Sequence, residues 1–246
     1  MSMRGDAMVP YGLALRAYAD GASGAEFTIR RDDGVEDPMP VSHYFRDVSD
    51  LNEIESTALQ RCHGRVLDVG GGTGVHSLVL QSRGLSVTAI DVDPNAVEIM
   101  AQRGVADAKL ADVFDYTGGP FDTVILLEHG IGIVGDLRGL ADFLAHAHSL
   151  ICDSGQLLVD SMDVSRTSDP VHLAYHELLR RTGRYIGEIR IQIQFGDAVS
   201  RFFGWLHVDP QTLERCAGDA GWGVETLCED ESGNYLARMT RRRPSN

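Results

Sequence analysis

Short runs of aliphatic and β-branched residues alternate with helix-forming stretches through the middle of this chain. In order, the segments read RVLDV, VHSLVLQSR, SVTAID, NAVEIMAQR, AKLAD, FDTVILL, LRGLADFLAHAHSLI and GQLLVDS. Such alternation is typical of βαβ units that build a parallel sheet. Strands with few polar positions are expected where helices cover both faces of the sheet. We therefore predict an α/β fold with a doubly wound, mostly parallel sheet over residues 65–161.

The pattern differs on both sides of this core. Before it, a helix is predicted over residues 50–61, in a stretch otherwise rich in aromatic, charged and turn residues. After it, the pattern predicts a helix over 171–181, a period-two strand over 185–193, a turn at Gly196-Asp197 and a second strand over 200–208. A helix from Asp209-Pro210 to about Gly221 and a hairpin of 222–228 with 235–240 are predicted to follow. The strand over 185–193 can pair with a second copy if it lies at a sheet edge.

The length and the cysteines bound the class of protein. A chain of 246 residues is enough for one well-packed α/β domain, so we predict a single domain over residues 1–246. The cysteines show no C-x-x-C pairing and no zinc-like spacing; they are Cys62, Cys152, Cys216 and Cys228. With no signal-peptide pattern and no apolar run of the roughly 20 residues that span a bilayer, we expect reduced thiols and a cytoplasmic location.

The charge argues against nucleic acids and anionic membranes as partners. The net charge is −14, and Lys109 is the only lysine. A protein that neutralises phosphates needs a basic face, and the only basic run is the arginine triplet at 241–243. We therefore expect a small-molecule partner and a monomer or homodimer.

A glycine-rich turn after the first core strand is the most informative motif. The segment VLDVGGGTG places Gly70, Gly72 and Gly74 where a buried strand runs into a helix. Glycine lets the backbone adopt left-handed conformations and approach a ligand closely. A dinucleotide-binding fingerprint would have its third glycine at position 75, where this chain has Val75.

Carboxylates follow or end three successive strands of the same βαβαβ unit. Asp91 ends SVTAID at the distance from the glycine turn where an acidic side chain accepts ribose hydroxyls. Asp93 is the better candidate for the N-cap of the next helix. Asp112 ends the third strand, where a carboxylate followed by Val113 suits an adenine amino group and ring. Together with Asp68 in the first strand, these acids indicate a nucleoside-binding edge.

These segments resemble the motifs of class I S-adenosylmethionine-dependent methyltransferases. VLDVGGGTG, VTAIDVDPNAV, ADVFDY, FDTVILLEHGIG and GQLLVDS are similar to motifs I, post-I, II, IV and VI. The resemblance covers about residues 65–160. It implies a Rossmann-like fold with a seven-stranded sheet whose final strand is reversed, an N-terminal lid (1–60), an inserted β-hairpin (162–208) and a terminal helix and hairpin (209–246). It also implies S-adenosylmethionine as cofactor, S-adenosylhomocysteine as product, and no metal.

The same resemblance implies which residues hold the cofactor. The glycine loop wraps the methionine part, and Asp68 orients the loop or contacts the methionine amine through water. Asp91 holds the ribose, and Leu127 touches the amino end. The implied cofactor-binding residues are Asp68, Gly70, Gly72, Gly74, Asp91, Val92, Asp112, Val113, Leu127 and Tyr44.

The end of the fourth strand bears on the acceptor. Methyltransferases of nucleic-acid amines carry an Asn/Asp-Pro-Pro-aromatic tetrad there, whereas this chain has Leu127-Glu128-His129-Gly130. Lys109 lies at the wrong end of its strand for a metal-dependent O-methyltransferase. The candidate catalytic residues are His129, Glu128 and Tyr11. His129 serves as a base or fixes the substrate, or it is a hydrogen-bonded loop residue; the sequence leaves these alternatives open.

Aromatic residues in the predicted lid suggest a flat acceptor held by stacking. The candidate substrate-binding residues are Tyr11, Tyr18, His43, His129 and Trp205. The segment His43-Tyr44-Phe45-Arg46 resembles a bacterial subgroup of small-molecule methyltransferases. The whole chain is similar to N-methyltransferases of toxoflavin biosynthesis, an antibiotic pathway whose acceptors are planar pyrimidotriazines. The alternatives are an O- or C-methyltransferase of another natural product, a nicotinamide-dependent oxidoreductase and a non-catalytic cofactor-binding regulator.

Overall fold

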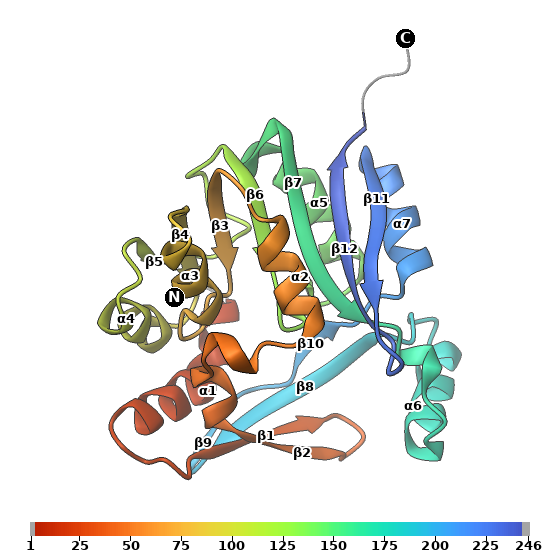
Figure 1. Ribbon diagram of the computed structural model, residues 1–246. Helices are drawn as coiled ribbons and strands as arrows, with labels where there is room; N and C mark the ends of the chain where they lie inside the picture. The colour runs from red at the N-terminus through yellow and green to blue at the C-terminus, as the bar shows by residue number, and fades with distance from the viewer. Residues whose placement is uncertain (1–2, 243–246) are drawn as a thin grey trace. The chain divides into compact units, whose positions relative to one another are not determined.

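In a computed structural model that describes residues 3–242, the chain is an α/β protein with two sheets (Figure 1). The larger sheet has seven strands, in the order β11 (Trp222–Glu229), β12 (Asn234–Arg241), β7 (Ile151–Met162), β6 (Phe121–Leu126), β3 (Arg65–Val69), β4 (Ser86–Asp91) and β5 (Ala108–Leu110). The pairs β3–β4, β4–β5 and β6–β7 are parallel, whereas β12 is antiparallel to both neighbours. This confirms the predicted fold class and its one reversed strand.

The second sheet has the order β10 (Phe203–Leu206), β8 (Glu188–Phe195), β1 (Glu26–Arg31) and β2 (Glu36–Pro40), with β9 (Ala198–Val199) also paired to β8. The pairing is antiparallel between β1 and β2, and between β8 and each of β1 and β9. Because β8 lies between β10 and β1, it is not the free edge that pairing with a second copy would require.

The helices largely match the pattern of the sequence. They are α1 (Met3–Ala19), α2 (Glu53–Arg61), α3 (Val75–Ser82), α4 (Pro94–Arg103), α5 (Leu137–Leu150), α6 (Pro170–Arg181) and α7 (Pro210–Asp219). The predicted N-cap Asp93 is confirmed, because it accepts hydrogen bonds from the backbone N–H groups of Asn95 and Ala96. Asp209 caps α7 in the same way, accepting from the N–H groups of Gln211 and Thr212.

Several predicted boundaries were wrong. The third core strand ends at Leu110, so Asp112 lies in the loop beyond it. The helix predicted from residue 50 begins at Glu53, because Val48–Asp50 forms a separate 3-10 turn closed by a capping box with Asp47. The strand predicted from residue 185 begins at Glu188, whose N–H instead donates to Tyr185 O in a turn.

The strand predicted over 200–208 is split in two. β9 ends at Val199 and β10 begins at Phe203. Between them, Ser200 Oγ accepts the N–H of Ile193 at 2.9 Å and bonds to Arg201 O at 2.9 Å. A side chain that bonds to nearby backbone in this way replaces the ladder that a continuous strand would need.

The hairpin β1–β2 was not predicted. Its turn contains Gly34 at φ 93°, and its second strand contains Pro38 and Pro40. Proline donates no ladder hydrogen bond, so β2 did not have the composition expected of a strand; it is tolerated here because β2 is an edge strand.

The chain divides into two compact units. The first comprises the described residues up to Asn52 with Cys62–Tyr116 and Arg190–Phe203, and the second comprises Glu53–Arg61, Thr117–Ile189 and the described residues from Gly204. The single domain over 1–246 stays a prediction.

Each unit has its own buried core. In the first, α1 packs on α4, and the core cluster includes Leu15, Phe27 and Ile99. In the second, α5 and α7 lie on one side of β7, β12 and β11, and α2 lies on the other (Figure 1). Trp222 is fully buried there, and its Nε1–H donates to Leu144 O at 3.0 Å.

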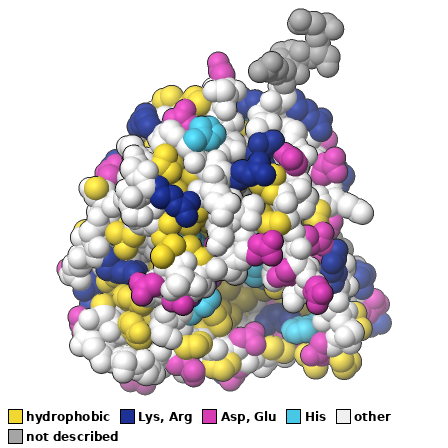
Figure 2. Space-filling model, viewed as in Figure 1, with side chains coloured by type: hydrophobic (Ala, Val, Ile, Leu, Met, Phe, Trp, Pro, Cys, Tyr) yellow, Lys and Arg dark blue, Asp and Glu magenta, His cyan; other side chains and the backbone are white. Residues whose placement is uncertain are grey.

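The surface carries mixed charges. On the face seen in Figure 2, acidic and basic side chains are interspersed, without a basic stripe. Of the arginines at 241–243, Arg243 lies outside the described residues, as do Met1 and Ser2. Within the part of the chain that is described, no helix is both long enough and apolar enough to cross a membrane.

Candidate functional site

The glycine loop connects β3 to α3 in the first unit. Gly70, Gly72 and Gly74 have φ values of 72°, 56° and 85°, in the left-handed region that favours glycine. A Cβ on Gly74 would lie 2.6 Å from the Val105 side chain, and one on Gly71 would lie 2.8 Å from Met100 Sδ. The loop therefore needs glycine both for its turns and for its close packing on α4 and the segment that follows it.

Asp91 closes the loop from the end of β4. Its Oδ2 accepts the N–H of Gly72 at 3.0 Å, and its Oδ1 accepts the N–H of Asp93 at 2.9 Å. Burial raises the pKa of Asp91 to about 6, although these backbone hydrogen bonds oppose the shift. A carboxylate has about four acceptor positions, so Asp91 retains capacity for further donors.

Asp68 is buried on β3 and tied to the first turn of α3. Its Oδ2 accepts Ser77 Oγ–H at 2.6 Å. Burial raises the pKa of Asp68, while His76 and the hydrogen bonds from Ser77 act in the opposite direction. The contact joins the strand before the glycine loop to the helix after it.

Tyr11 of α1 brings the N-terminal helix to the glycine loop. A Cβ on Gly72 would lie 3.1 Å from the Tyr11 hydroxyl. The Tyr11 ring is buried and packs edge-on against Phe27 and Tyr44, with centroids 5.6 and 5.1 Å away. The ring of Tyr11 is thus part of a core, and its hydroxyl is the part that faces the loop.

A second contact fixes the loop to the segment around Tyr44. Thr73 Oγ1 donates to Tyr44 O, and Arg103 donates to Thr73 O at 2.9 Å and Thr73 Oγ1 at 2.5 Å. The Arg103 guanidinium also lies over the Phe45 ring, 5.3 Å from its centroid. The contact between Thr73 and Arg103 was not predicted, because it spans 30 positions and Arg103 lies outside the glycine motif that contains Thr73.

The other predicted residues of the first unit lie at varied depths. Val113 is buried, while Val92 and Asp112 are half-buried; Asp112 Oδ1 accepts the N–H of Phe114 at 3.2 Å. Tyr18 packs on Phe45 with ring centroids 4.6 Å apart. His43, in the 3-10 helix η1 (Val41–Phe45), packs edge-on against Tyr44 at 5.3 Å.

In the second unit, β6 ends in an unusual turn. After the buried Leu127, Glu128 and His129 have φ values of 60° and 57°, and they are the described non-glycine residues with positive φ. Left-handed backbone at such a residue costs roughly 1–2 kcal/mol. Asp160 of β7 compensates for this cost, because its Oδ1 and Oδ2 accept the His129 backbone N–H at N···O distances of 2.9 and 3.1 Å.

The His129 side chain is held as well. Its Nε2 lies 3.1 Å from Asn234 Oδ1, and its ring packs edge-on against His207, with centroids 5.4 Å apart. Burial, and then the charge of His129, lower the pKa of His207 to about 3. The contacts of His129 with Asp160, Asn234 and His207 were not predicted. Asp160 lies 31 positions and Asn234 105 positions away along the chain.

Trp205 of β10 lies beside the same segment. A Cβ on Gly132, in the 3-10 helix η3 (Gly130–Val134), would lie 2.2 Å from the Trp205 indole. Only glycine therefore fits against this face of the indole. Among the described residues, no group of three or more His, Cys, Asp or Glu side chains is arranged to hold a metal ion.

Comparisons with known proteins show which family the chain resembles. Residues 42–227 match the model of a family described as a methyltransferase domain. The chain resembles a SAM-dependent methyltransferase from Bacteroides fragilis, solved in complex with S-adenosyl-L-homocysteine, with 33% identity and a TM-score of 0.85 over 99% of this chain and 98% of that one.

Two further similarities cover less of this chain. An uncharacterized methyltransferase of Staphylococcus carnosus is 37% identical over 113 residues, 46% of this chain and 52% of the relative. The chain therefore spans about half the length of that curated relative. The CcbJ methyltransferase of Streptomyces caelestis is 13% identical, with a TM-score of 0.59 over 77% of this chain and 89% of that one. At that identity the likeness shows the fold alone.

Proposed function

The chain belongs to the family of S-adenosylmethionine-dependent methyltransferases, and from this premise we propose that it methylates a small, planar N-heterocyclic metabolite in the cytoplasm. The observation that carries the methyl-transfer part is the closure of the glycine loop by Asp91. The finer choice of acceptor, a pyrimidotriazine of the toxoflavin type, rests on the similarity of the whole sequence and is tested separately below.

The residues of the first unit fit the cofactor. The glycine loop packs so closely that a side chain at Gly71 or Gly74 would clash with Met100 or Val105. The buried Asp91 has acceptor capacity for two ribose hydroxyls. In this proposal Val92 and Val113 pack on the nucleoside, and Asp112 accepts from the adenine amino group. Tyr11 and Tyr44 are the lid residues on the methionine side.

The turn after β6 carries the residues that we propose for the methyl acceptor. When bound, S-adenosylmethionine supplies an electrophilic methyl carbon on a sulfonium sulfur. The protein has to align the acceptor nitrogen with that carbon and exclude water. His129 takes up the proton or orients the acceptor, Glu128 and Leu127 line the same turn, and Trp205 offers a flat apolar surface.

The charge supports a small acceptor. A net charge of −14 with a single lysine does not suit binding to a nucleic-acid phosphate backbone.

The aromatic residues that suit a planar ring are His43, Tyr18 and Tyr44, each half-buried. No disulfide joins the four cysteines in the described part of the chain, which supports a reducing compartment.

Mass spectrometry of acceptor panels tests the proposal. The protein is incubated with S-adenosylmethionine and with separate sets of desmethyl pyrimidotriazines, phenols and amines. We expect a gain of one methylene on the heterocycles, and its loss in Asp91→Ala. A gain on phenols alone would replace N-methylation by O-methylation. Methylation of no acceptor by a protein that still binds the cofactor would overturn the heterocycle proposal.

A further inference from the structure

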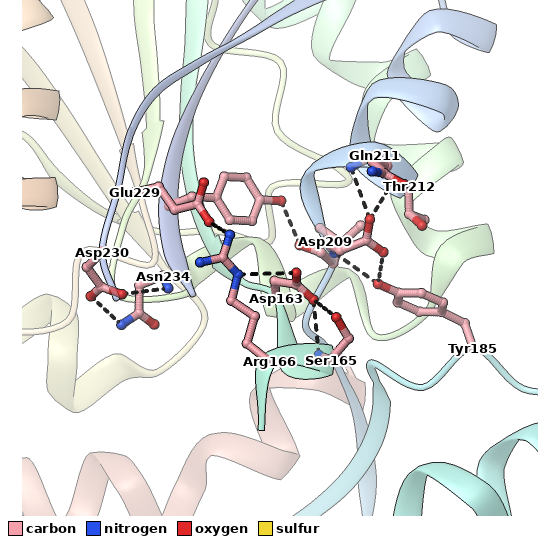
Figure 3. A network of polar contacts seen from close by, with 12 residues as sticks. Asp163, Ser165, Arg166, Tyr185, Asp209, Gln211, Thr212, Glu229, Asp230 and Asn234 are labelled. Atoms are coloured by element: carbon pink, nitrogen blue, oxygen red, sulfur yellow. Dashed lines mark hydrogen bonds and ion pairs between the residues drawn. The ribbon is translucent and has the colours of Figure 1, made fainter. Parts of the chain in front are cut away.

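The turn of the β11–β12 hairpin holds one amide side chain in a fixed orientation. The Asp230 carboxylate accepts the Asn234 backbone N–H at 2.9 Å and the Asn234 Nδ2–H at 2.7 Å (Figure 3). The Asp230 N–H in turn donates to Asn234 O at 2.9 Å. An ionised carboxylate only accepts hydrogen bonds, so the amide nitrogen of Asn234 faces Asp230 and its Oδ1 is free to accept from another donor.

The state of Asp230 supports this orientation. Burial acts against ionisation, but the hydrogen bonds from the Asn234 side chain and backbone outweigh it and lower the pKa of Asp230. The carboxylate is therefore ionised at neutral pH and keeps the Asn234 amide from turning over.

This orientation decides which nitrogen of His129 carries a proton. Asn234 Oδ1 lies 3.1 Å from His129 Nε2. A carbonyl oxygen has no proton to give, so His129 Nε2 must be the donor. In a neutral imidazole the other nitrogen is then unprotonated. The hairpin thus leaves the lone pair on His129 Nδ1.

The surroundings of His129 keep the ring in place. Asp160 anchors the backbone N–H, and the turn continues with the Gly132 N–H donating to His129 O at 2.8 Å. The neighbouring His207 is neutral at physiological pH because burial lowers its pKa to about 3, and its backbone N–H donates to Gly187 O at 2.8 Å. His207 therefore packs against His129 without adding a competing positive charge.

We infer that Asn234 and Asp230 are positioning residues that fix His129 with its proton on Nε2, so that Nδ1 is the atom offered to the methyl acceptor. The inference rests on the proposed function for the role of His129. As the acceptor nitrogen bonds to the methyl carbon, its proton passes to Nδ1, and the electron pair of the broken S–CH₃ bond stays on sulfur. The hydrogen-bond chain Asp230–Asn234–His129 accommodates the resulting imidazolium, whose Nε2–H still donates to Asn234.

Nitrogen NMR of ¹⁵N-histidine-labelled full-length protein tests the tautomer without reference to activity. The His129 resonances are identified by their loss in His129→Gln, at a pH where the imidazole is neutral. In the wild type we expect Nε2 protonated and Nδ1 unprotonated. In Asn234→Leu, which cannot accept, we expect a mixture of both tautomers. A proton on Nδ1 in the wild type, or an unchanged spectrum in Asn234→Leu, would overturn the inference.

Kinetics provide the second readout. Loss of one orienting hydrogen bond is expected to lower kcat about tenfold in Asn234→Leu, with cofactor affinity unchanged. Asp230→Ala, in which the amide can turn over, should show the same loss if Asn234→Leu fails to fold. Glu225→Gln, on β11 and paired with Arg238, is the matched control and should retain wild-type kcat. Wild-type kcat in both Asn234→Leu and Asp230→Ala would contradict the inference. Absence of transferase activity in the wild type would refute the proposed function instead, while the NMR spectrum would still decide the tautomer.

Discussion

Asp91 accepts the backbone N–H of Gly72 at 3.0 Å, across 19 positions of sequence. This hydrogen bond joins the end of β4 to the middle glycine of the loop after β3. A single buried carboxylate therefore both shapes the loop and remains available to donors of a ligand.

The raised pKa of Asp91 predicts a pH dependence of cofactor affinity. In the proposed cofactor site, ribose hydroxyls would donate to the ionised Asp91 carboxylate, and burial raises the pKa of Asp91 to about 6. Protonation at lower pH removes the acceptor, so the affinity for S-adenosylhomocysteine should fall as pH falls through about 6, by about tenfold at pH 5 relative to pH 8. Isothermal titration calorimetry across this range measures the effect. Asp91→Asn should bind weakly at every pH, and a wild-type affinity that stays flat down to pH 5 would contradict the assignment.

A methyl group at Gly72 separates the backbone role of the loop from its ligand role. Gly72→Ala places a Cβ 3.1 Å from the Tyr11 hydroxyl at φ 56°. Gly84→Ala has a similar backbone penalty at φ 84° with open space around it. Each should lose about 1 kcal/mol of unfolding free energy, measured by chemical denaturation. Only Gly72→Ala should weaken cofactor binding; equal binding by the two variants would count against a ligand at the loop.

Asp160 should stabilise the left-handed turn at Glu128 and His129. Removing a charged acceptor from the His129 N–H is expected to lower the free energy of unfolding of Asp160→Ala by about 2 kcal/mol. Asp153→Ala is the control on the same strand: Asp153 is fully exposed and pairs with Arg241, so this variant should retain wild-type stability. Similar losses in both variants would mean that Asp160 does not compensate for the strained turn.

His207 should make the protein sensitive to acid. Its folded pKa of about 3 lies below that of an unfolded histidine, so between about pH 6.5 and 3 the unfolded chain binds a proton that the folded chain excludes. Stability is therefore lost as pH falls, by about 2 kcal/mol from this residue at pH 5. Asp91 acts in the opposite direction between about pH 6 and 4, so a comparison of variants is needed to isolate the effect of His207.

His207→Phe provides that comparison. The quantity to compare is the change in the free energy of unfolding when the pH is lowered from 7 to 5. This change should favour the folded state by about 2 kcal/mol more in the variant than in the wild type. Urea denaturation at the two pH values measures it. The same pH dependence in variant and wild type would show that His207 can be protonated in the folded protein.

The sequence predicted the local features of the fold and the nearness of Asp91 to the glycine loop. The alternation of β3, α3, β4 and α4 follows from periodicity, and the glycine loop with Asp91 follows from spacing, because these residues are close along the chain. Only the family resemblance indicated the reversal of β12. Proline-containing β2 had no strand signal, since an edge strand tolerates residues that an inner strand excludes.

The surroundings of His129 could not be predicted in this way. Asn234 reaches His129 across 105 positions through a hairpin turn, and Asp160 reaches its backbone across 31. Neither contact leaves a periodic signal, because each depends on the register in which β12 pairs with β7. That register places Asn234 opposite Met162, next to the strand end from which Asp160 reaches the turn.

Calorimetric titration of the wild-type protein and Asp91→Ala with S-adenosylhomocysteine tests whether the cofactor binds at the glycine loop. We expect one binding site per chain in the wild type and loss of most of the affinity in a folded Asp91→Ala. Absence of binding to the wild type, or equal affinity in the two proteins, would contradict the assignment of the cofactor site to the glycine loop and Asp91.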